Sequence, residues 1–430
     1  MKKQRFLGFA VIERIFKSAL VRQRIALGHL GIIFGRFLLH LHALGYAHNK
    51  IRDHARVIEH FSRWLNQQEV SLKQLSTLHV RQFLRHHLPR CRCGRPAPKC
   101  PTQCQSSLAL LVKFLRAQKR IKEGVAKTGP PQNPTDQLLV AYDRHLDRVY
   151  GLSAGTRRRR ERSARRLLKW TFGSRQPQVR KIQARQVSRF VFERARQLGP
   201  AGIHALVVCL RSFLRFLELS GRLPQGLAAA VPQPKRSVRP APVKVLEPQE
   251  WRRFLKSFSR STATGRRDYA IALCLCTLAL RSQEVAALTL DDVDWRAMTV
   301  RLSHTKQRRQ RLLPLPDAVA RAILDYLKAG RPSTQSRALF VYHRAPLDRG
   351  MSAQSVRRLV RRAFARCGIK TGNAYILRHT WATWAHRQGA DLKLIADLLG
   401  HRSLETTQQY AHVNVEELRQ VALPWPRIPR

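Results

Sequence analysis

Two proline-rich stretches divide this chain of 430 residues into three parts, and the division limits what each part can fold into. Residues 124–134 (GVAKTGPPQNP) contain two glycines and three prolines, and residues 232–242 (PQPKRSVRPAP) are proline-rich and basic. Proline and glycine interrupt helices, so we interpret both stretches as domain boundaries. At 44% hydrophobic content, the chain has enough apolar residues to bury real cores. We therefore predict domains at residues 1–124, 134–232 and 245–425.

Apolar residues recur at helical spacing through the first two parts. Residues 108–115 (LALLVKFL) resemble residues 210–217 (LRSFLRFL), and Trp64 and Trp170 lie at equal distances after Gly-Tyr and Gly-Leu pairs. This weak internal repeat predicts two all-helical units, at residues 28–124 and 134–230. Coincidence among leucine-rich helices is the alternative, because short helical patterns recur readily.

The third part has a different pattern. A buried helix is expected over residues 269–280 and a further helix over residues 283–290. Residues 299–302 and 311–315 read as two strands joined by a polar, basic turn, and helical patterns resume beyond them. The predicted fold class is therefore mainly α, with an α+β third domain that carries one small antiparallel sheet.

The charge of the chain indicates a polyanionic partner. Lys and Arg number 81 against 26 Asp and Glu, which gives a formal net charge of +55. Such an excess repels itself in a compact molecule unless a polyanion is near, and a phosphate backbone supplies one. A ribosomal or chromatin-type binder is the alternative interpretation. The most basic run is expected to form one helix that contacts DNA phosphates, with candidates Arg157, Arg158, Arg159 and Arg160.

Neither an export signal nor a membrane span is predicted. The N-terminus opens with basic residues, but Glu13, Arg14 and Lys17 interrupt the apolar run that a signal peptide needs. The longest apolar stretch, residues 269–280, is too short to cross a bilayer. Without a secretory signal, the eight cysteines are expected to be reduced thiols. We expect a cytoplasmic, DNA-directed protein with no membrane partner.

Five side chains in the third part suit chemistry on a phosphodiester: Arg281, Lys306, Arg378, His401 and Tyr410. Two arginines can hold the non-bridging oxygens of a phosphate, and a lysine and a histidine can move protons. A tyrosine hydroxyl can attack phosphorus and form a covalent link. Taken singly, each residue has an ordinary alternative: a surface ion pair, a histidine at a helix end or a packed tyrosine.

The segments around these five residues resemble the motifs of the tyrosine recombinases, also called the phage integrase family. They are LRSQEV from Leu280, HTK ending at Lys306, LRHTWAT from Leu377, LLGH ending at His401 and TTQQY ending at Tyr410. The resemblance covers about residues 245–415, and residues 134–230 resemble the family's helical core-binding domain. It implies helical SAM-like DNA-binding units followed by a catalytic tyrosine recombinase domain, with residues 1–124 as an additional helical unit.

The resemblance also implies a role for each residue. Arg281 and Arg378 would clamp the scissile phosphate, and Tyr410 would attack it to leave a 3′-phosphotyrosyl bond. Lys306 would be the general acid for the departing 5′-oxygen, and His401 would hold the phosphate or share proton transfer. The phosphotyrosyl link conserves the bond energy, so no cofactor is required for catalysis. A tetramer on two sites in double-stranded DNA is implied, with residues 413–424 docking on a neighbouring subunit and related recombinases as further possible partners.

Three more residues are supporting candidates. Glu284 lies on the same helical face as Arg281 and could hold its guanidinium, or could be an ordinary exposed carboxylate. Tyr375 stands where the family usually has His or Lys, and a phenol is a poor base near neutral pH. This departure leaves the proton acceptor for Tyr410 open, with His379 and His304 as nearby substitutes in the sequence.

Together these features predict a site-specific DNA recombinase, and the extra N-terminal unit favours the integrase or transposase of a mobile element. Two alternatives remain. The departure at Tyr375 is compatible with a weak or inactive accessory subunit that binds DNA without cutting it. The same catalytic residues would also serve relaxation of supercoiled DNA, as in type IB topoisomerases.

A cysteine-rich insertion in the first part is a candidate metal site. Four thiolates within a short stretch could bind one Zn²⁺ tetrahedrally: Cys91, Cys93, Cys100 and Cys104. His86 and His87 lie close by in the sequence. The spacing differs from the usual pairs of Cys-x-x-Cys, so a reduced, proline-rich loop is the alternative.

Overall fold

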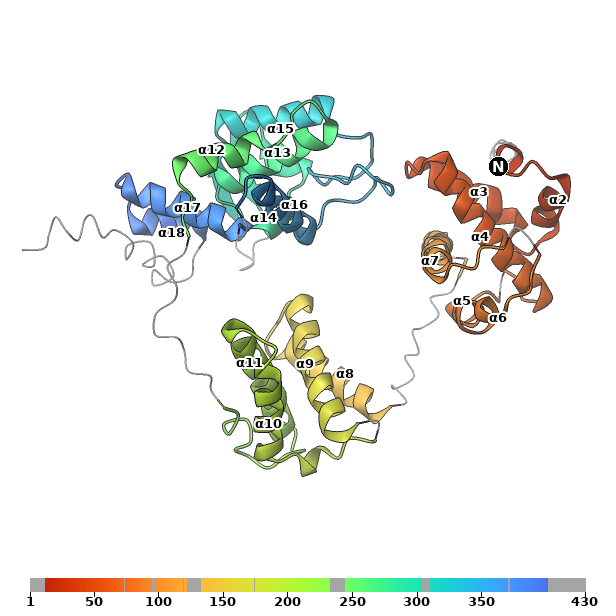
Figure 1. Cartoon of the computed structure of the whole chain (residues 1–430), viewed down its shortest axis with the longest axis horizontal. Helices are drawn as coiled ribbons and strands as arrows, with labels where there is room; N and C mark the ends of the chain where they lie inside the picture. The colour runs from red at the N-terminus through yellow and green to blue at the C-terminus, as the bar shows by residue number, and fades with distance from the viewer. Residues whose placement is uncertain are drawn as a thin grey trace, which may run out of the picture. The chain divides into compact units, whose positions relative to one another are not determined.

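The computed structural model describes most of the chain in segments. They are residues 12–72, 74–94, 97–118, 120–121, 133–173, 175–232, 244–303, 310–369 and 372–400. The described residues fall into two compact units. One is formed mainly by residues 133–232, and the other contains the helices before them and the mixed part after them. Figure 1 shows the three consecutive stretches coloured from red through yellow to blue.

The described residues of the N-terminal stretch form helices joined by short connections. Its elements are α2 (Ala19–Leu27), α3 (Gly31–Ala43), α4 (His48–Gln67), α5 (Thr77–Gln82), a π-helical turn (Phe83–His87), α6 (Leu88–Arg90) and α7 (Pro101–Ala117). Its core includes Phe37, Phe61 and Leu111, which lie on α3, α4 and α7. Phe83 in the π-helical turn packs edge to face against Phe61, so this turn is joined to α4. Proline at the first position of α7 fixes where that helix begins.

The middle stretch is a second helical unit. It contains α8 (Pro134–Arg148), α9 (Ala154–Phe172), a 3₁₀ turn (Val179–Lys181), α10 (Ala184–Ala195) and α11 (Pro200–Leu219). Asn133 and Ser153 cap α8 and α9 by accepting hydrogen bonds from backbone N–H groups. Tyr142 of α8 is fully buried against Phe213 of α11, and α9 covers both helices. The helical structure predicted for the first two parts is confirmed.

The C-terminal stretch combines seven helices with a small sheet among its described residues. The helices are α12 (Pro248–Lys256), α13 (Ala263–Cys276), α14 (Ser282–Ala287), α15 (Asp317–Ala329), α16 (Ala353–Arg366), α17 (Ala374–Arg387) and α18 (Leu392–Leu399). The central helix α13 is buried over most of its length and packs against α15 and α17 (Figure 1). Phe254, Leu275, Ile323 and Phe364 meet in one continuous core.

The sheet has three antiparallel strands in the order β1 (Val293–Asp294), β2 (Thr299–Leu302) and β3 (Arg311–Pro314). Val300 lies opposite Leu313, and Leu302 lies opposite Arg311. The two predicted strands are confirmed, with β3 one residue shorter than expected. β1 was not predicted because a strand of two residues is too short to show alternation.

The helix expected over residues 283–290 ends earlier, at Ala287, in the structure. The side chains and backbone N–H groups of Thr289 and Asp292 then form a reciprocal cap on a separate 3₁₀ turn, Leu290–Asp292. This local pairing competes successfully with continuation of the helix. The buried helix expected over residues 269–280 is present as α13, which begins six residues earlier behind the cap Thr262 and ends at Cys276.

Most of the two proline-rich stretches lies outside the described residues. The division into domains at residues 1–124, 134–232 and 245–425 therefore stays a prediction. Within the described part of the chain, every helix is too short or too polar to cross a membrane.

Two glycines near helix N-termini should respond oppositely to substitution by alanine. A Cβ on Gly265 of α13 would lie 1.6 Å from the carbonyl oxygen of Ser259, whereas a Cβ on Gly155 of α9 would meet nothing within 4 Å. We expect Gly265→Ala to destabilise the chain by about 2–4 kcal/mol through overpacking. Gly155→Ala should be neutral or stabilising by up to about 1 kcal/mol. Calorimetric unfolding of the full chain measures both, and equal midpoints for the two variants would contradict this account of α13.

Candidate active site

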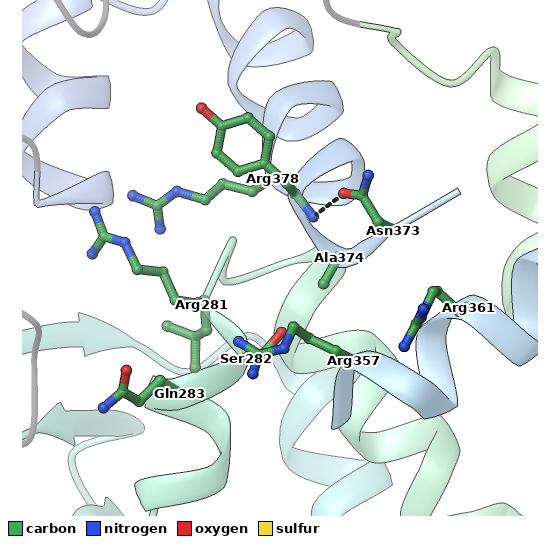
Figure 2. Close-up of a pocket in the computed structure, with 10 residues that line it drawn as sticks. Arg281, Ser282, Gln283, Arg357, Arg361, Asn373, Ala374 and Arg378 are labelled. Carbon is green, nitrogen blue, oxygen red and sulfur yellow. Dashed lines mark hydrogen bonds between the residues drawn. The ribbon is translucent and has the colours of Figure 1, made fainter. Parts of the chain in front are cut away.

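A pocket in the C-terminal stretch is lined by four arginines. It has a volume of about 360 Å³, and its lining residues are Leu280, Arg281, Ser282, Gln283, Arg357, Arg361, Asn373, Ala374, Tyr375 and Arg378. Arg281 precedes α14, Arg357 and Arg361 lie on α16, and Arg378 lies on α17 (Figure 2). None of these lining residues is a carboxylate. The pocket is therefore suited to a group with several negative charges.

Arg281 is held by its own helix. It caps α14, and its backbone N–H donates to Glu284 Oε2 at 2.8 Å while its Nη1 donates to Glu284 Oε1 at 2.8 Å. Glu284 Oε1 also accepts from Arg311 Nη2 at 2.9 Å. The Glu284 side chain is only 2% exposed, so this carboxylate is a buried bridge between two guanidinium groups. The expectation that Glu284 could hold Arg281 agrees with this contact.

Arg378 is buried beside Arg281. Its Nη1 donates to the carbonyl of Ala279 at 2.7 Å, and its Nη2 donates to the carbonyl of Leu399. Ala279 has a φ of +48°, a conformation that a residue with a Cβ rarely adopts. That backbone turn places the Ala279 carbonyl within reach of Arg378. Figure 2 shows the Arg281 and Arg378 side chains extending toward the same side of the pocket.

Three arginines converge on the C-terminal end of α18. The carbonyls of Leu398 and Leu399 accept from Arg311 and Arg378, and the Gly400 carbonyl accepts from Arg281 at 3.4 Å. A helix leaves its last carbonyls without partners inside the helix, and cationic donors satisfy them well. Gly400 has a φ of +63°, and a Cβ there would lie 2.9 Å from the Arg311 guanidinium. The left-handed backbone thus favours glycine where the chain leaves α18.

Tyr375 and His379 form a second pair on α17. Their ring centroids are 3.9 Å apart in an edge-to-face arrangement. Tyr375 is 56% exposed and faces the pocket, whereas His379 is 1% exposed. Burial, followed by the charge of Arg378, lowers the pKa of His379 to about 4. A neutral imidazole with so low a pKa is a weak base, which favours a packing role behind Tyr375 over proton acceptance.

Three arginines at the site were not expected from the sequence: Arg311, Arg357 and Arg361. Arg357 and Arg361 lie one helical turn apart on α16, so both side chains reach the same pocket. The spacing of these two arginines could have indicated an anion-binding pair. A helix face that is simply basic and solvent-exposed has the same spacing. Arg311 was expected only as the first residue of a strand, and its contact with Glu284 depends on the strand register.

Three of the five predicted catalytic residues lie outside the described residues: Lys306, His401 and Tyr410. His304 lies outside them as well. The described neighbours on either side of the hairpin turn are Ser303 and Gln310, and Gly400 is the last described residue before His401. The structure therefore brings together Arg281 and Arg378, with Glu284, Tyr375 and His379 beside them. The catalytic roles of all five predicted residues stay predictions.

The basic run in the middle unit lies on α9, as predicted, but its arginines differ in their surroundings. Arg157 forms ion pairs with Asp143 and Asp147 of α8, and Arg160 Nη1 donates to Ser212 Oγ at 2.9 Å. Arg158 and Arg159 are exposed, and no ion pair joins either of them to a described residue. Contact of this run with DNA stays a prediction, with Arg158 and Arg159 as the side chains most open to it.

The cysteine-rich insertion is separate from this pocket. Cys91 and Cys93 lie beside two histidines, His60 and His87, in a group of possible metal ligands. Cys100 and Cys104, which the sequence analysis placed in the same site, do not belong to this group. The Cys104 thiol is buried and donates to the Pro98 carbonyl, and Cys100 is exposed beside Thr102.

Comparison with known proteins agrees with the site. A family model described as the phage integrase family matches residues 244–417. A putative integrase/recombinase y4rA of Sinorhizobium fredii is 33% identical over 89% of this chain and 91% of its own length. This chain belongs to the phage integrase family. As a member of these tyrosine recombinases, it is a site-specific DNA recombinase that cleaves and rejoins DNA.

Other members of the phage integrase family show more limited similarity. The tyrosine recombinase XerC of Pelobacter propionicus is 31% identical over 56% of this chain and 79% of its own length. A solved structure of the Tn1549 transposon integrase with a circular intermediate DNA covers 67% of this chain and 98% of its own chain. Its TM-score is 0.52 at 18% identity, so it supports the fold class: mainly helical with a small antiparallel sheet.

Replacing Glu284 with Gln should weaken the contacts that hold Arg281 and Arg311 in place. An amide keeps the shape but removes the negative charge between Arg281 and Arg311, which are half-buried. We expect a loss of about 1–3 kcal/mol of unfolding free energy and at least about tenfold slower DNA cleavage. Glu161→Gln is the matched control, because Glu161 forms a more exposed pair with Arg165 on α9. Denaturation and single-turnover cleavage measure the two effects, and equal behaviour of the variants would argue against a bridging role.

Proposed function

We propose that Arg281 and Arg378 hold the scissile phosphate of DNA while Tyr410 attacks it. The observation that carries this proposal is the pocket itself, which four arginines and no carboxylate line. Arg281 and Arg378 donate to the neighbouring carbonyls of Gly400 and Leu399, so both guanidinium groups are fixed before any substrate binds. Preorganised donors of this kind stabilise the charge that develops on phosphate oxygens in the transition state.

The chemical step is a transesterification. The Tyr410 hydroxyl gives its proton to a base as its oxygen forms a bond to phosphorus. The bond from phosphorus to the 5′-oxygen breaks, and Lys306 supplies the proton to that oxygen. A 3′-phosphotyrosyl bond and a 5′-hydroxyl result, and attack by a 5′-hydroxyl reverses the step. One ester replaces another, so the exchange needs neither ATP nor a cofactor. His401 follows Gly400, which Arg281 holds, and this connection supports a role for His401 at the phosphate.

We further propose that the enzyme serves a mobile element. The similarity to the putative integrase/recombinase y4rA covers 89% of the chain, whereas the similarity to the tyrosine recombinase XerC covers 56%, so y4rA shares more of this chain than XerC does. A tetramer on two DNA sites, with residues 413–424 docked on a neighbouring subunit, completes the proposal. Sequencing the DNA on both sides of the gene tests the mobile-element role, since that role requires element ends nearby.

Tyr410→Phe should abolish covalent attachment to DNA. A nicked suicide duplex, built from the DNA flanking the gene, loses its short 5′-hydroxyl fragment after cleavage and traps the phosphotyrosyl adduct. We expect the adduct on denaturing gels with wild-type enzyme and at least about a thousandfold less with Tyr410→Phe, because the nucleophile is missing. Tyr150→Phe is the matched control, since Tyr150 is an exposed tyrosine on the middle unit.

Each alternative function has a separate outcome in the same experiments. Binding of the duplex by wild-type enzyme without any adduct would support an accessory DNA-binding subunit. Relaxation of supercoiled DNA that lacks a specific site would support topoisomerase-like activity. An adduct that persists in Tyr410→Phe would contradict the assignment of the nucleophile.

Arg361→Gln should slow cleavage more than Arg362→Gln. Both residues are exposed on α16, but Arg361 lines the active-site pocket and Arg362 lines a different one that includes Asp268. We expect about a tenfold lower single-turnover rate for Arg361→Gln and less than about threefold for Arg362→Gln. Each variant removes one positive charge. The comparison therefore distinguishes the loss of a contact inside the pocket from the loss of overall positive charge. Equal rates would show that only net charge matters.

A further inference from the structure

Two histidines and two cysteines meet in the N-terminal helices. His60 lies near the middle of α4, His87 ends the π-helical turn, and Cys91 and Cys93 follow α6. Their potential ligand atoms all lie within 4.8 Å of one another. His60 and Cys91 are buried, and His87 and Cys93 are half-buried. The cluster thus joins one long helix to a short segment that has little regular structure.

The distances between these atoms suit a tetrahedral metal ion. His60 Nε2 is 3.2 Å from His87 Nε2 and 3.2 Å from Cys91 Sγ, and Cys93 Sγ is 3.6 Å from His87 Nε2. Zinc binds imidazole nitrogen at about 2.0–2.1 Å and thiolate sulfur at about 2.3 Å. Two such ligands at a tetrahedral angle lie about 3.3–3.8 Å apart. The observed separations are close to the edges of that tetrahedron.

Hydrogen bonds alone do not explain the arrangement. Each Nε2 atom faces two partners: His60 Nε2 faces His87 and Cys91, and His87 Nε2 faces His60 and Cys93. A ring nitrogen carries either one hydrogen or one lone pair in the ring plane, so it can form only one good hydrogen bond there. A cation at the centre of the four atoms accepts all four lone pairs at once.

The other two cysteines of the insertion have partners of their own. The Cys104 thiol donates to the Pro98 carbonyl at 3.3 Å, and Cys100 contacts the Thr102 hydroxyl at 3.2 Å. Cys104 lies in the first turn of α7, and Cys100 caps that helix and is exposed. The four-cysteine set expected from the sequence is therefore less suitable than the set of two histidines and two cysteines.

We propose that His60, His87, Cys91 and Cys93 bind one structural Zn²⁺. Two thiolates balance its charge, and four protein ligands leave no open position for a substrate, which is typical of structural sites. The ion ties α4 to the segment after α6, where α6 itself has only three residues. Within the described residues, the Arg63 side chain adds a further polar link between these segments by donating to the Gly94 carbonyl at 3.1 Å.

Metal content of the purified full chain tests the site. Mass spectrometry of protein grown with zinc should find about one zinc per chain. Cys93→Ser and His87→Ala should each reduce this content at least about fivefold. Cys100→Ser and His86→Ala are matched controls, because both residues are exposed neighbours outside the cluster, and both variants should retain the zinc.

Cobalt exchange provides a measurement on the unaltered chain, in case a variant does not fold. Co²⁺ in place of zinc should show the intense visible bands of a tetrahedral ion, together with thiolate-to-cobalt charge transfer from two sulfurs. Zinc content below about one fifth of an equivalent, with no tetrahedral cobalt spectrum, would overturn the proposal. Loss of zinc from Cys100→Ser to the same extent as from Cys93→Ser would overturn the ligand set.

Discussion

The buried carboxylate of Glu284 holds together the segments on which the active site depends. Its Oε1 accepts from both Arg281 and Arg311, and its Oε2 accepts from the backbone at the start of α14. Arg311 lies on β3 and also donates to the end of α18. A single negative charge therefore links a helix start, a strand and a helix end. Burying it is favourable only because two guanidinium groups surround it.

The balance of charge at this site favours an anion. Four arginines line the pocket: Arg281, Arg357, Arg361 and Arg378. Arg311 lies behind them, and among the described residues Glu284 is the one carboxylate that bridges Arg281 and Arg311. Burial lowers the pKa of Arg311, which reflects the cost of keeping that cation out of water. A phosphate in the pocket would offset the mutual repulsion of these cations. The site is thus arranged for a ligand that carries negative charge.

The sequence predicted the parts of the site that lie within short motifs. Arg281 and Glu284 are one helical turn apart, and the strand that begins at Arg311 was expected from the sequence. The carbonyls of Ala279 and Leu399 could not be predicted, because a backbone acceptor has no sequence signature. Arg357 and Arg361 resemble an ordinary solvated face until α16 is packed against α14. Lys306, His401 and Tyr410 stay predictions, since their assignment depends on the motifs.

The cysteine-rich insertion shows that the spacing of cysteines along the chain does not by itself identify all the ligands of a metal site. A Cys-x-Cys pair supplies two sulfurs, and sequence proximity suggests that the next two cysteines complete the set. Helix α7 begins directly after Cys100 and takes Cys104 into its first turn, where the thiol has a carbonyl partner. His60 is far away in the sequence, but α4 brings it within 3.2 Å of Cys91. Spacing along the chain identified Cys91 and Cys93, but only the packing of α4 against this segment places His60 beside them. Arg281 and Arg378 are likewise far apart in the sequence and are brought together by the fold.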